Sequence, residues 1–271
     1  MSAGSSLTRR RAVVLVAVLV TVCAAVLATV LLLGPSSPVP APAAEPPPEE
    51  LPGPVLLVPG YGGRTTDLQS LADRLRSADR DVTVVALPDG GTGDLTGSAA
   101  ELDRAAAEAL DRTGAGSVDV VGFSAGGLIA RLWVAGPGAD VARRVLTLGS
   151  PHHGTTVADL ATRYAPGQCP PGCRQMATAS ELLATLNAVD ETPGNTDWIS
   201  IWTTQDTVVT PPDSARLDGA VNVPVQSVCA GARLSHNQLP GSPLVHEIVV
   251  LQLGADDPEE LGPDDCARLG G

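Results

Sequence analysis

A serine flanked by glycines is the first feature of this sequence that could do chemistry. Gly122-Phe-Ser124-Ala-Gly126 follows the apolar stretch 118–121 and precedes a second apolar stretch that runs to Val134. A G-x-S-x-G motif between a strand and a helix is typical of a nucleophile elbow, where glycines let the chain reverse sharply and leave the serine hydroxyl exposed. The sequence therefore predicts that Ser124 is a nucleophile.

A serine nucleophile needs an imidazole to take its proton, and after a nucleophile elbow the acid and then the histidine follow along the chain. His236 and His246 are the two histidines late enough in the sequence. His236 lies in a polar loop after the last predicted strand, where the base belongs. His246 lies within the predicted closing helix 243–253, so surface packing is the role expected for it.

The predicted acid is an aspartate that comes soon after a strand. Asp206 follows the apolar stretch Trp198–Thr203, which is the position of the carboxylate that orients the imidazole. Capping the end of that strand is the alternative role of Asp206, and Asp213 and Asp218 are the alternative acids. Asp94 follows a glycine-rich loop and is expected to stabilise that loop or to cap the next helix.

Two backbone N–H groups are expected to bind the negative oxygen that forms when a serine attacks a carbonyl. One belongs to Ala125, directly after the nucleophile, and the other to Tyr61, in the glycine-rich loop after the first predicted strand. Both donors are main-chain groups, so side-chain identity does not test this prediction.

Strand and helix signals alternate along the chain from residue 53 onward. The alternation predicts an α/β fold, with a mainly parallel sheet and helices on both faces. The insertion 151–197 is the least regular part, with only 180–188 looking helical, and is expected to form a lid or a wall of the binding site. Strands are predicted at 55–58, 81–87, 117–122, 144–148, 198–203 and 221–225, and helices at 67–78, 98–112, up to about 134, and 243–253.

Five segments are expected, and the first two bear on location. An uncharged apolar run of about 22 residues can cross a bilayer as one hydrophobic helix, and the arginines before it favour a cytoplasmic N-terminus. The run is a membrane anchor or a cleaved signal segment, which puts the catalytic domain on the extracellular side, anchored to the cell membrane or secreted. The segments are a basic segment 1–11, the apolar run 12–33, a proline-rich linker 34–52, the α/β domain 53–255 and an acidic, solvated tail 256–271.

Four cysteines lie in the part of the chain expected to be exported, where disulfides persist. Three pairings of Cys169, Cys173, Cys229 and Cys266 are formally possible. The favoured pairing joins Cys169 to Cys173 and Cys229 to Cys266. A zinc site is the alternative, disfavoured because no histidine stands close in sequence to the first two cysteines. No metal or cofactor is expected.

The formal net charge is −13 at pH 7. This charge disfavours nucleic-acid binding, because phosphate backbones are bound by lysine and arginine side chains. A neutral small molecule is the expected kind of substrate, and the catalytic domain is expected to be monomeric.

Six stretches together carry a family resemblance: 54–63 PVLLVPGYGG, 91–94 GTGD, the elbow, 150–155 SPHHGT, 203–206 TTQD and 235–239 SHNQL. From Pro54 to about Leu253 the chain resembles the class 2 lipases of the α/β-hydrolase superfamily, small secreted lipases and esterases of bacteria. Phe123 departs from the pattern, because the elbow more often carries histidine there, and it should alter only the shape of the pocket. The resemblance also implies that the His152-His153 turn forms a wall of that pocket.

The resemblance implies an exported serine hydrolase that cleaves carboxylic esters with an acyl or lipid chain, as a triacylglycerol lipase or a carboxylesterase. Its triad would be Ser124, Asp206 and His236, acting through an acyl-enzyme. An acyltransferase with the same triad, which passes the acyl group to an alcohol or a sugar, is one alternative. A non-catalytic binding module is the other, and the complete triad weighs against it.

Overall fold

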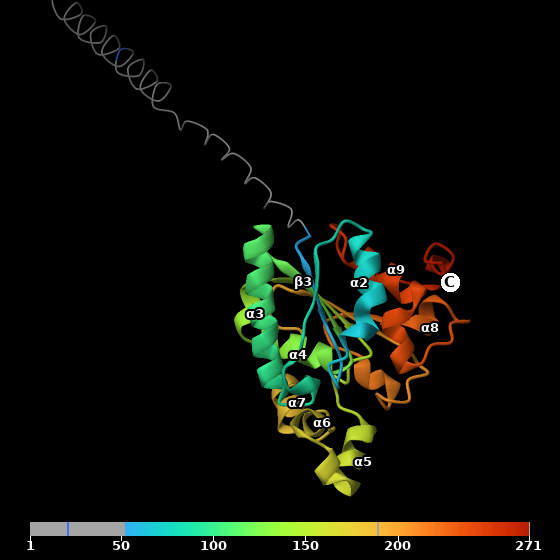
Figure 1. Cartoon of the computed structure of the whole chain (residues 1–271). Coiled ribbons are helices and arrows are strands. Elements are labelled where there is room, and N and C mark those ends of the chain that lie inside the picture. The colour runs from blue at the N-terminus through green and yellow to red at the C-terminus, as the bar shows by residue number, and fades with distance from the viewer. Residues whose placement is uncertain (1–20, 22–51, 189, 271) are drawn as a thin grey trace, which may run out of the picture. The chain divides into compact units, whose positions relative to one another are not determined.

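The computed structural model describes residues 21, 52–188 and 190–270 (Figure 1). The chain divides into two compact units, Met1–Pro48 and Glu49–Gly271, and the second contains every element described below. The predicted segments 1–11, 12–33 and 34–52 lie outside the described residues, apart from Thr21 and Pro52. Within the described ranges, no helix has the length and apolar character needed to span a membrane.

Six strands form one sheet in the order β2-β1-β3-β4-β5-β6, and all neighbours pair in parallel. The carboxyl ends of the strands therefore lie at one edge. The order reverses at β1, because β2 is added on one side of it and β3 on the other, and open α/β sheets bind ligands at that edge beside such a reversal. The strands are β1 Val55–Val58, β2 Val82–Val84, β3 Val118–Phe123, β4 Ala142–Leu148, β5 Asp197–Trp202 and β6 Val221–Pro224.

Helices cover both faces of the sheet, which confirms the predicted α/β fold (Figure 1). Along β1, Leu57 enters the hydrophobic core on one face and Leu56 the core on the other. Because both faces are buried, β1 is a continuous apolar run in the sequence. The helices are α2 Gln69–Arg76 and α9 Pro243–Gln252 on the first face, and α3 Leu95–Thr113 and α4 Ala125–Val134 on the second.

The insertion 151–197 is more regular than the sequence predicts. Its described residues contain three α-helices, whereas only one helix, near 180–188, is expected. None of the three exceeds 9 residues, which is too short for the periodic apolar pattern that reveals a helix in a sequence. The helices are α5 Thr156–Tyr164, α6 Pro171–Gln175 and α7 Glu181–Leu186.

Both favoured disulfides are confirmed. Cys169 is bonded to Cys173 across a separation of 4 residues, and Cys229 to Cys266 across 37. The zinc alternative is therefore wrong, because the sulfur atoms that it would use are bonded to one another. The first bond closes a tight loop at α6, and the second attaches the C-terminal tail to the domain.

The acidic tail packs against the domain, so the expectation of a solvated end is wrong. Cys266 is bonded to Cys229, and Leu269 is buried. The Gln252 side chain donates to the carbonyl of Glu259 over 2.7 Å and accepts from its N–H over 3.0 Å. A disulfide, the burial of Leu269 and the hydrogen bonds between the Gln252 side chain and the Glu259 backbone hold the segment, while its charged side chains stay at the surface.

A buried carboxylate joins the sheet to the end of the last helix. Asp119 of β3 is fully buried and accepts hydrogen bonds from Arg143 over 2.6 and 2.9 Å and from Arg80. Both guanidinium groups also donate to the carbonyl of Leu253, directly after α9. Because the last carbonyls of a helix have no partner within it, the two arginines satisfy the helix end and balance the buried charge.

The Asp119→Asn substitution is expected to lower the free energy of unfolding by about 3–5 kcal/mol, because it leaves buried guanidinium groups without their counter-charge. Urea unfolding of the full-length chain measures the change. The matched control is Asp81→Asn, since Asp81 also bonds an arginine, Arg112, but at the surface. The control should cost less than about 1 kcal/mol, and similar losses in both variants would contradict the role given to Asp119.

Candidate active site

Ser124 stands at a sharp turn between β3 and α4. Its φ of 52° and ψ of −121° lie in a region that residues other than glycine rarely adopt. A Cβ at position 122 would come within 2.5 Å of the backbone of Gly126 and Gly127. The strand and the helix therefore meet backbone to backbone, and their close packing holds Ser124 in the conformation of a nucleophile elbow.

The structure brings the predicted base and acid together. His236 Nδ1 lies 2.7 Å from Asp206 Oδ2, and both side chains are buried. The other carboxylate oxygen accepts the N–H groups of Val208 and Val209 over 2.8 and 2.9 Å. Asp206 thus holds the imidazole and also caps a turn, so its two expected roles coexist. With Nδ1 bound to the carboxylate, Nε2 is the nitrogen left to accept a proton from a hydroxyl.

The loop that carries His236 is fixed by polar side chains. Thr203, after β5, donates to the carbonyl of Leu234 over 2.8 Å. Ser235 and Gln238 form a capping box at the start of the 3₁₀ helix His236–Gly241, in which the side chain of each residue accepts a hydrogen bond from the backbone N–H of the other. The loop that positions the imidazole is therefore held by a residue at the end of β5 as well as by its own capping box.

The end of β4 connects the serine with the imidazole. The N–H of Ser124 donates to the carbonyl of Leu148 over 2.8 Å. The next residue, Gly149, has a φ of 59°, and a Cβ there would lie 3.2 Å from Nδ1 of His236. Phe123 packs against the same imidazole, with ring centroids 5.0 Å apart. Gly149 was missed from the sequence, although a glycine directly after a predicted strand is a signal for close approach.

The two predicted oxyanion donors flank the serine. Ala125 is the first residue of α4, where N–H groups have no acceptor within the helix. Tyr61 lines the same cavity as Ser124. The loop that contains Tyr61 is fixed by a hydrogen bond, in which the N–H of Gly62 donates to the carbonyl of Gly91 over 3.2 Å. Both N–H groups belong to backbone held in place before any substrate binds.

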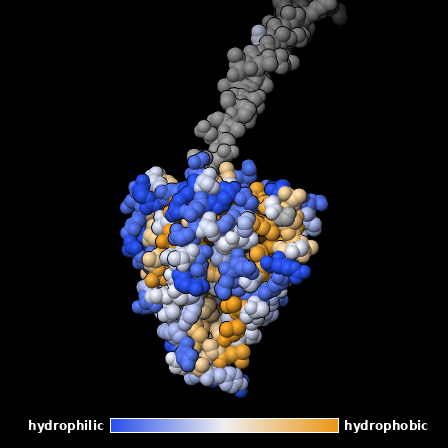
Figure 2. Space-filling view, turned by 45° about the vertical axis from the view of Figure 1, so that its right-hand side comes forward, coloured by the Kyte–Doolittle hydropathy of each residue, from blue (hydrophilic) through white to orange (hydrophobic). Residues whose placement is uncertain are grey.

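An apolar cavity of about 160 Å³ opens beside Ser124. Tyr61, Val157 and Val208 line it and are partly exposed to solvent, while Ala158 of α5 is buried. Figure 2 shows hydrophobic surface at the end of the domain where α5 lies in Figure 1. An apolar cavity beside a serine hydroxyl suits the acyl part of an ester.

The His152-His153 turn contributes less to the pocket than the resemblance implies, since Pro151 rather than either histidine lines the cavity. His152 is fully buried, and its Nε2 lies 3.0 Å from Thr147 Oγ1. Burial, followed by the charges of Arg131 and His153, holds the pKa of His152 well below its usual value. Because α4 and β4 enclose this imidazole, it stays neutral and has a structural role.

The remaining candidates take no part in the site. Asp94 caps α3 by accepting the N–H of Thr96 over 2.8 Å, as expected, and hydrogen bonds from Gln175 and then from that N–H lower its pKa. His246 is buried rather than at the surface, because α9 packs into the first hydrophobic core, and its Nε2 contacts the carbonyl of Pro240 at 2.7 Å. The alternative acid Asp218 bonds Arg216, and Asp213 lies on another pocket.

The parallel sheet, the helices on both faces and the serine elbow after β3 define an α/β hydrolase. The family model of the palmitoyl protein thioesterases matches residues 54–192. This match spans just over half of the chain, which therefore belongs to the palmitoyl protein thioesterase family. The matched residues include Tyr61 and Ser124 and end before Asp206 and His236. Comparison with curated proteins finds no match.

Solved structures of lipases have the same fold. Lipase B of Aspergillus fumigatus is 22% identical with a TM-score of 0.64, over 80% of this chain and 60% of that one. Mature lipase BlEst2 of Bacillus licheniformis is 20% identical with a TM-score of 0.64, over 79% of this chain and 96% of that one. The chain thus spans about 60% of the fungal lipase, and at these identities the likeness establishes the fold alone.

The buried His152 makes the domain sensitive to acid. Unfolded chain binds a proton on this residue near pH 6.5, whereas the folded domain does not. The free energy of unfolding should therefore fall below about pH 6.5, by up to about 1.4 kcal/mol per pH unit from this group. His152→Gln should reduce the slope measured by urea unfolding between about pH 6.5 and pH 5. The control Thr147→Val keeps the imidazole and should keep the slope, and an unchanged slope in His152→Gln would refute the assignment.

Proposed function

We propose that the protein is a serine hydrolase that cleaves carboxylic esters with an acyl chain. The observation that carries the proposal is the buried 2.7 Å contact between Asp206 and His236 beside a serine in the elbow conformation. Ser124 is the nucleophile, His236 the general base, and Asp206 orients the imidazole. The apolar cavity next to the serine supports an acyl substrate.

In the first half of the reaction, Nε2 of His236 takes the hydroxyl proton as Ser124 Oγ attacks the ester carbonyl carbon. The carbonyl oxygen becomes negative and accepts hydrogen bonds from the N–H groups of Ala125 and Tyr61. The adduct then collapses, the bond to the alcohol oxygen breaks, and the imidazolium protonates the departing alcohol. The acyl group remains on the serine.

In the second half, water replaces the alcohol. His236 takes a proton from water as the water oxygen attacks the acyl carbon, and the bond to Ser124 breaks. The imidazolium returns a proton to the serine, and a carboxylic acid leaves. The Asp206 carboxylate stabilises the imidazolium in both halves, and the N–H groups on its other oxygen keep it aligned. The cycle requires no metal or cofactor.

Acyl thioesters are a second candidate substrate, favoured by the family model, which is named for palmitoyl protein thioesterases. The same attack breaks a bond to sulfur instead of oxygen, and the thiol leaves. Comparing kcat/KM for an ester and a thioester with the same acyl group decides between the two classes.

Two alternative functions can be distinguished from a hydrolase by experiment. An acyltransferase would pass the acyl group from Ser124 to an alcohol, so hydrolysis in the presence of glycerol, followed by mass spectrometry of the products, separates it from a hydrolase. A non-catalytic binding module would leave Ser124 unmodified by a serine-directed phosphonate. Rapid labelling at this serine would exclude the binding module.

The proposal includes export of the domain 53–255 by the apolar run 12–33, as an anchored or a secreted monomer. The two disulfides support an oxidising compartment. Labelling of intact cells with a membrane-impermeant reagent tests export, and the amounts in membranes and in medium distinguish an anchor from a cleaved signal.

Ser124→Ala is expected to lower kcat for a short nitrophenyl ester by about a millionfold, because it removes the nucleophile. Asp206→Asn is expected to lower kcat by about ten-thousandfold, because the imidazole loses the carboxylate that orients it. Initial rates of the full-length chain measure both. Asp218→Asn is the matched control, because this aspartate is exposed and bonds Arg216. It should stay within about twofold of the parent chain. Undiminished hydrolysis in Ser124→Ala would refute the nucleophile.

A further inference from the structure

We infer that Gln226 is a positioning residue that keeps Asp206 and His236 aligned. It belongs to α8, Val225–Val228, which follows β6. Its side chain bonds both the turn that leads to Asp206 and the loop that leads to His236. The role rests on the proposed function, because the aligned pair serves the proton transfer from Ser124.

Both ends of the Gln226 side-chain amide are bonded. Its Oε1 accepts the N–H of Thr204 over 2.9 Å. Its Nε2 donates to the hydroxyl oxygen of Thr203 over 3.0 Å and to the carbonyl of Ala232 over 3.3 Å. Because an amide nitrogen carries two protons, it can make both donations at once. One side chain thus connects the end of β5 with the loop before His236.

The hydroxyl group of Thr203 extends this connection toward the imidazole. It donates its proton to the carbonyl of Leu234 over 2.8 Å, shortly before His236. A hydroxyl has one proton, so the oxygen of Thr203 is left to accept from Gln226. These directions also fix the Gln226 amide, since a flipped amide would turn its oxygen toward two other oxygen acceptors.

The connection made by Gln226 is more protected from water than its neighbour. Gln205 also donates to the carbonyl of Ala232, over 3.2 Å, but its side chain is exposed, so water competes for this bond. Gln226 is half-buried and Thr203 is fully buried. Apart from the direct contact of acid and base, the protected bonds between the acid turn and the base loop are therefore those of Thr203 and Gln226.

A small displacement of these two segments should affect the reaction more than the binding of substrate. Oδ2 of Asp206 meets Nδ1 of His236 at 2.7 Å, and a displacement of about 1 Å in an active site can lower a rate about a hundredfold. Gln226 is not among the residues that line the cavity beside Ser124. Its loss should therefore lower kcat and leave KM nearly unchanged.

The first test is Gln226→Met, which keeps the length of the side chain and removes its hydrogen bonds. In the full-length chain it should lower kcat for a short nitrophenyl ester about ten- to hundredfold and leave KM within about twofold. Thr203→Val removes the hydroxyl and should give a loss of the same order. An unchanged kcat in folded Gln226→Met would overturn the assignment, and if that variant does not fold, an unchanged kcat in Thr203→Val would do so.

Ser227→Ala is the matched control for activity. Ser227 is the next residue of α8, is exposed and donates to the carbonyl of Pro224 over 2.7 Å. The control should keep kcat within about twofold of the parent chain. A loss in Ser227→Ala equal to that in Gln226→Met would show that any change in α8 disturbs the site, and would overturn the specific role of Gln226.

A double-mutant cycle separates positioning from a general weakening of the fold. In the Asp206→Asn background the carboxylate that Gln226 helps to align is already gone. Gln226→Met should therefore lower kcat no more than about twofold further in that background. Equal losses in the two backgrounds would show that Gln226 acts independently of Asp206, and would overturn the assignment.

The proton NMR signal of the imidazole N–H group that faces Asp206 needs no substrate. A proton held between Nδ1 of His236 and a carboxylate should give a downfield signal in the parent chain, and Gln226→Met should broaden or remove it. Loss of the signal in this variant, with no hydrolysis by the parent chain, would overturn the proposed function but not the alignment by Gln226. An unchanged signal and unchanged hydrolysis would overturn the alignment and leave the proposed function intact.

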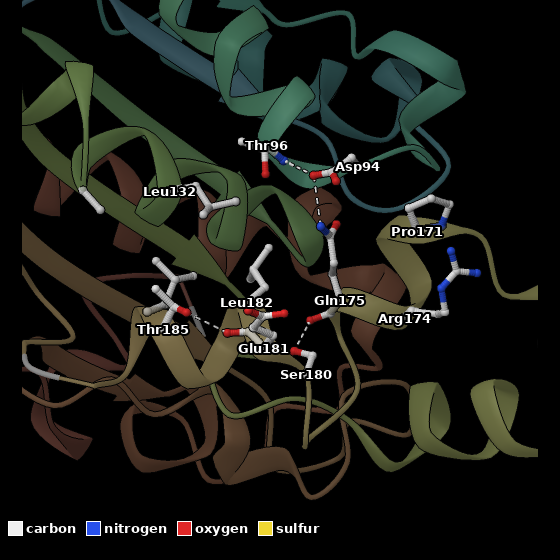
Figure 3. Close-up of a pocket in the computed structure, with 12 residues that line it drawn as sticks. Asp94, Thr96, Leu132, Pro171, Arg174, Gln175, Ser180, Glu181, Leu182 and Thr185 are labelled. Atoms are coloured by element: carbon white, nitrogen blue, oxygen red, sulfur yellow. Dashed lines mark hydrogen bonds between the residues drawn. The ribbon is translucent and has the colours of Figure 1, made fainter.

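Gln175→Met is the matched control for the signal. Gln175 also bridges two segments through its amide, because it accepts the N–H of Leu95 over 2.9 Å and donates to the carboxylate of Asp94 over 3.0 Å. It lines a groove between α4, α6 and α7, to which no residue of the triad contributes (Figure 3). The signal should persist in this variant, and its loss there as well as in Gln226→Met would overturn the specific role of Gln226.

Discussion

The close packing of β3 against α4 and β1 is the constraint on which the site depends. A Cβ at position 122 would collide with the first turn of α4, and one at position 126 would lie 2.3 Å from the carbonyl oxygen of Val58. Three backbones therefore meet without side chains between them, and Ser124 cannot relax to a common φ unless they separate. Burial of two hydrophobic cores thus sets the conformation of the nucleophile, so the strain is stabilised far from the reaction itself.

The same sheet brings the other groups to the serine. Tyr61 follows β1, Ser124 follows β3 and Asp206 follows β5, and because all these strands are parallel their carboxyl ends meet at one edge. His236 arrives later along the chain, and Thr203 at the end of β5 anchors its loop. At the opposite edge, the arginines on Asp119 tie the sheet to the last helix. The parallel sheet therefore brings Ser124 and Asp206 to one edge, and the hydrogen bonds of Thr203 and Asp206 bring His236 to them.

Site residues that closely follow a strand could be predicted from the sequence. Ser124 and Asp206 each follow an apolar run, and that pattern reports a strand end directly. Other features depend on what covers a segment, which a local pattern does not record. His246 was expected at the surface because its helix is recognisable, whereas it is buried and its Nε2 contacts the carbonyl of Pro240 in the preceding 3₁₀ helix. Gln175 was missed because its partner Leu95 is 80 residues away, and nothing near either residue signals the contact.

The residues of the triad and most of the residues that line the cavity beside Ser124 belong to different parts of this fold. Ser124 and Asp206 follow strands that two buried cores hold in place, whereas the cavity beside Ser124 is lined largely by the insertion, with α5 and the segment around α6. A substitution in the insertion can change the shape of this cavity while the sheet register and the elbow remain as they are. This separation explains why a serine nucleophile can be inferred from ten residues of sequence but the shape of the cavity cannot. The shape depends on where short helices lie in space, and long-range contacts such as that between Gln175 and Leu95 decide their position.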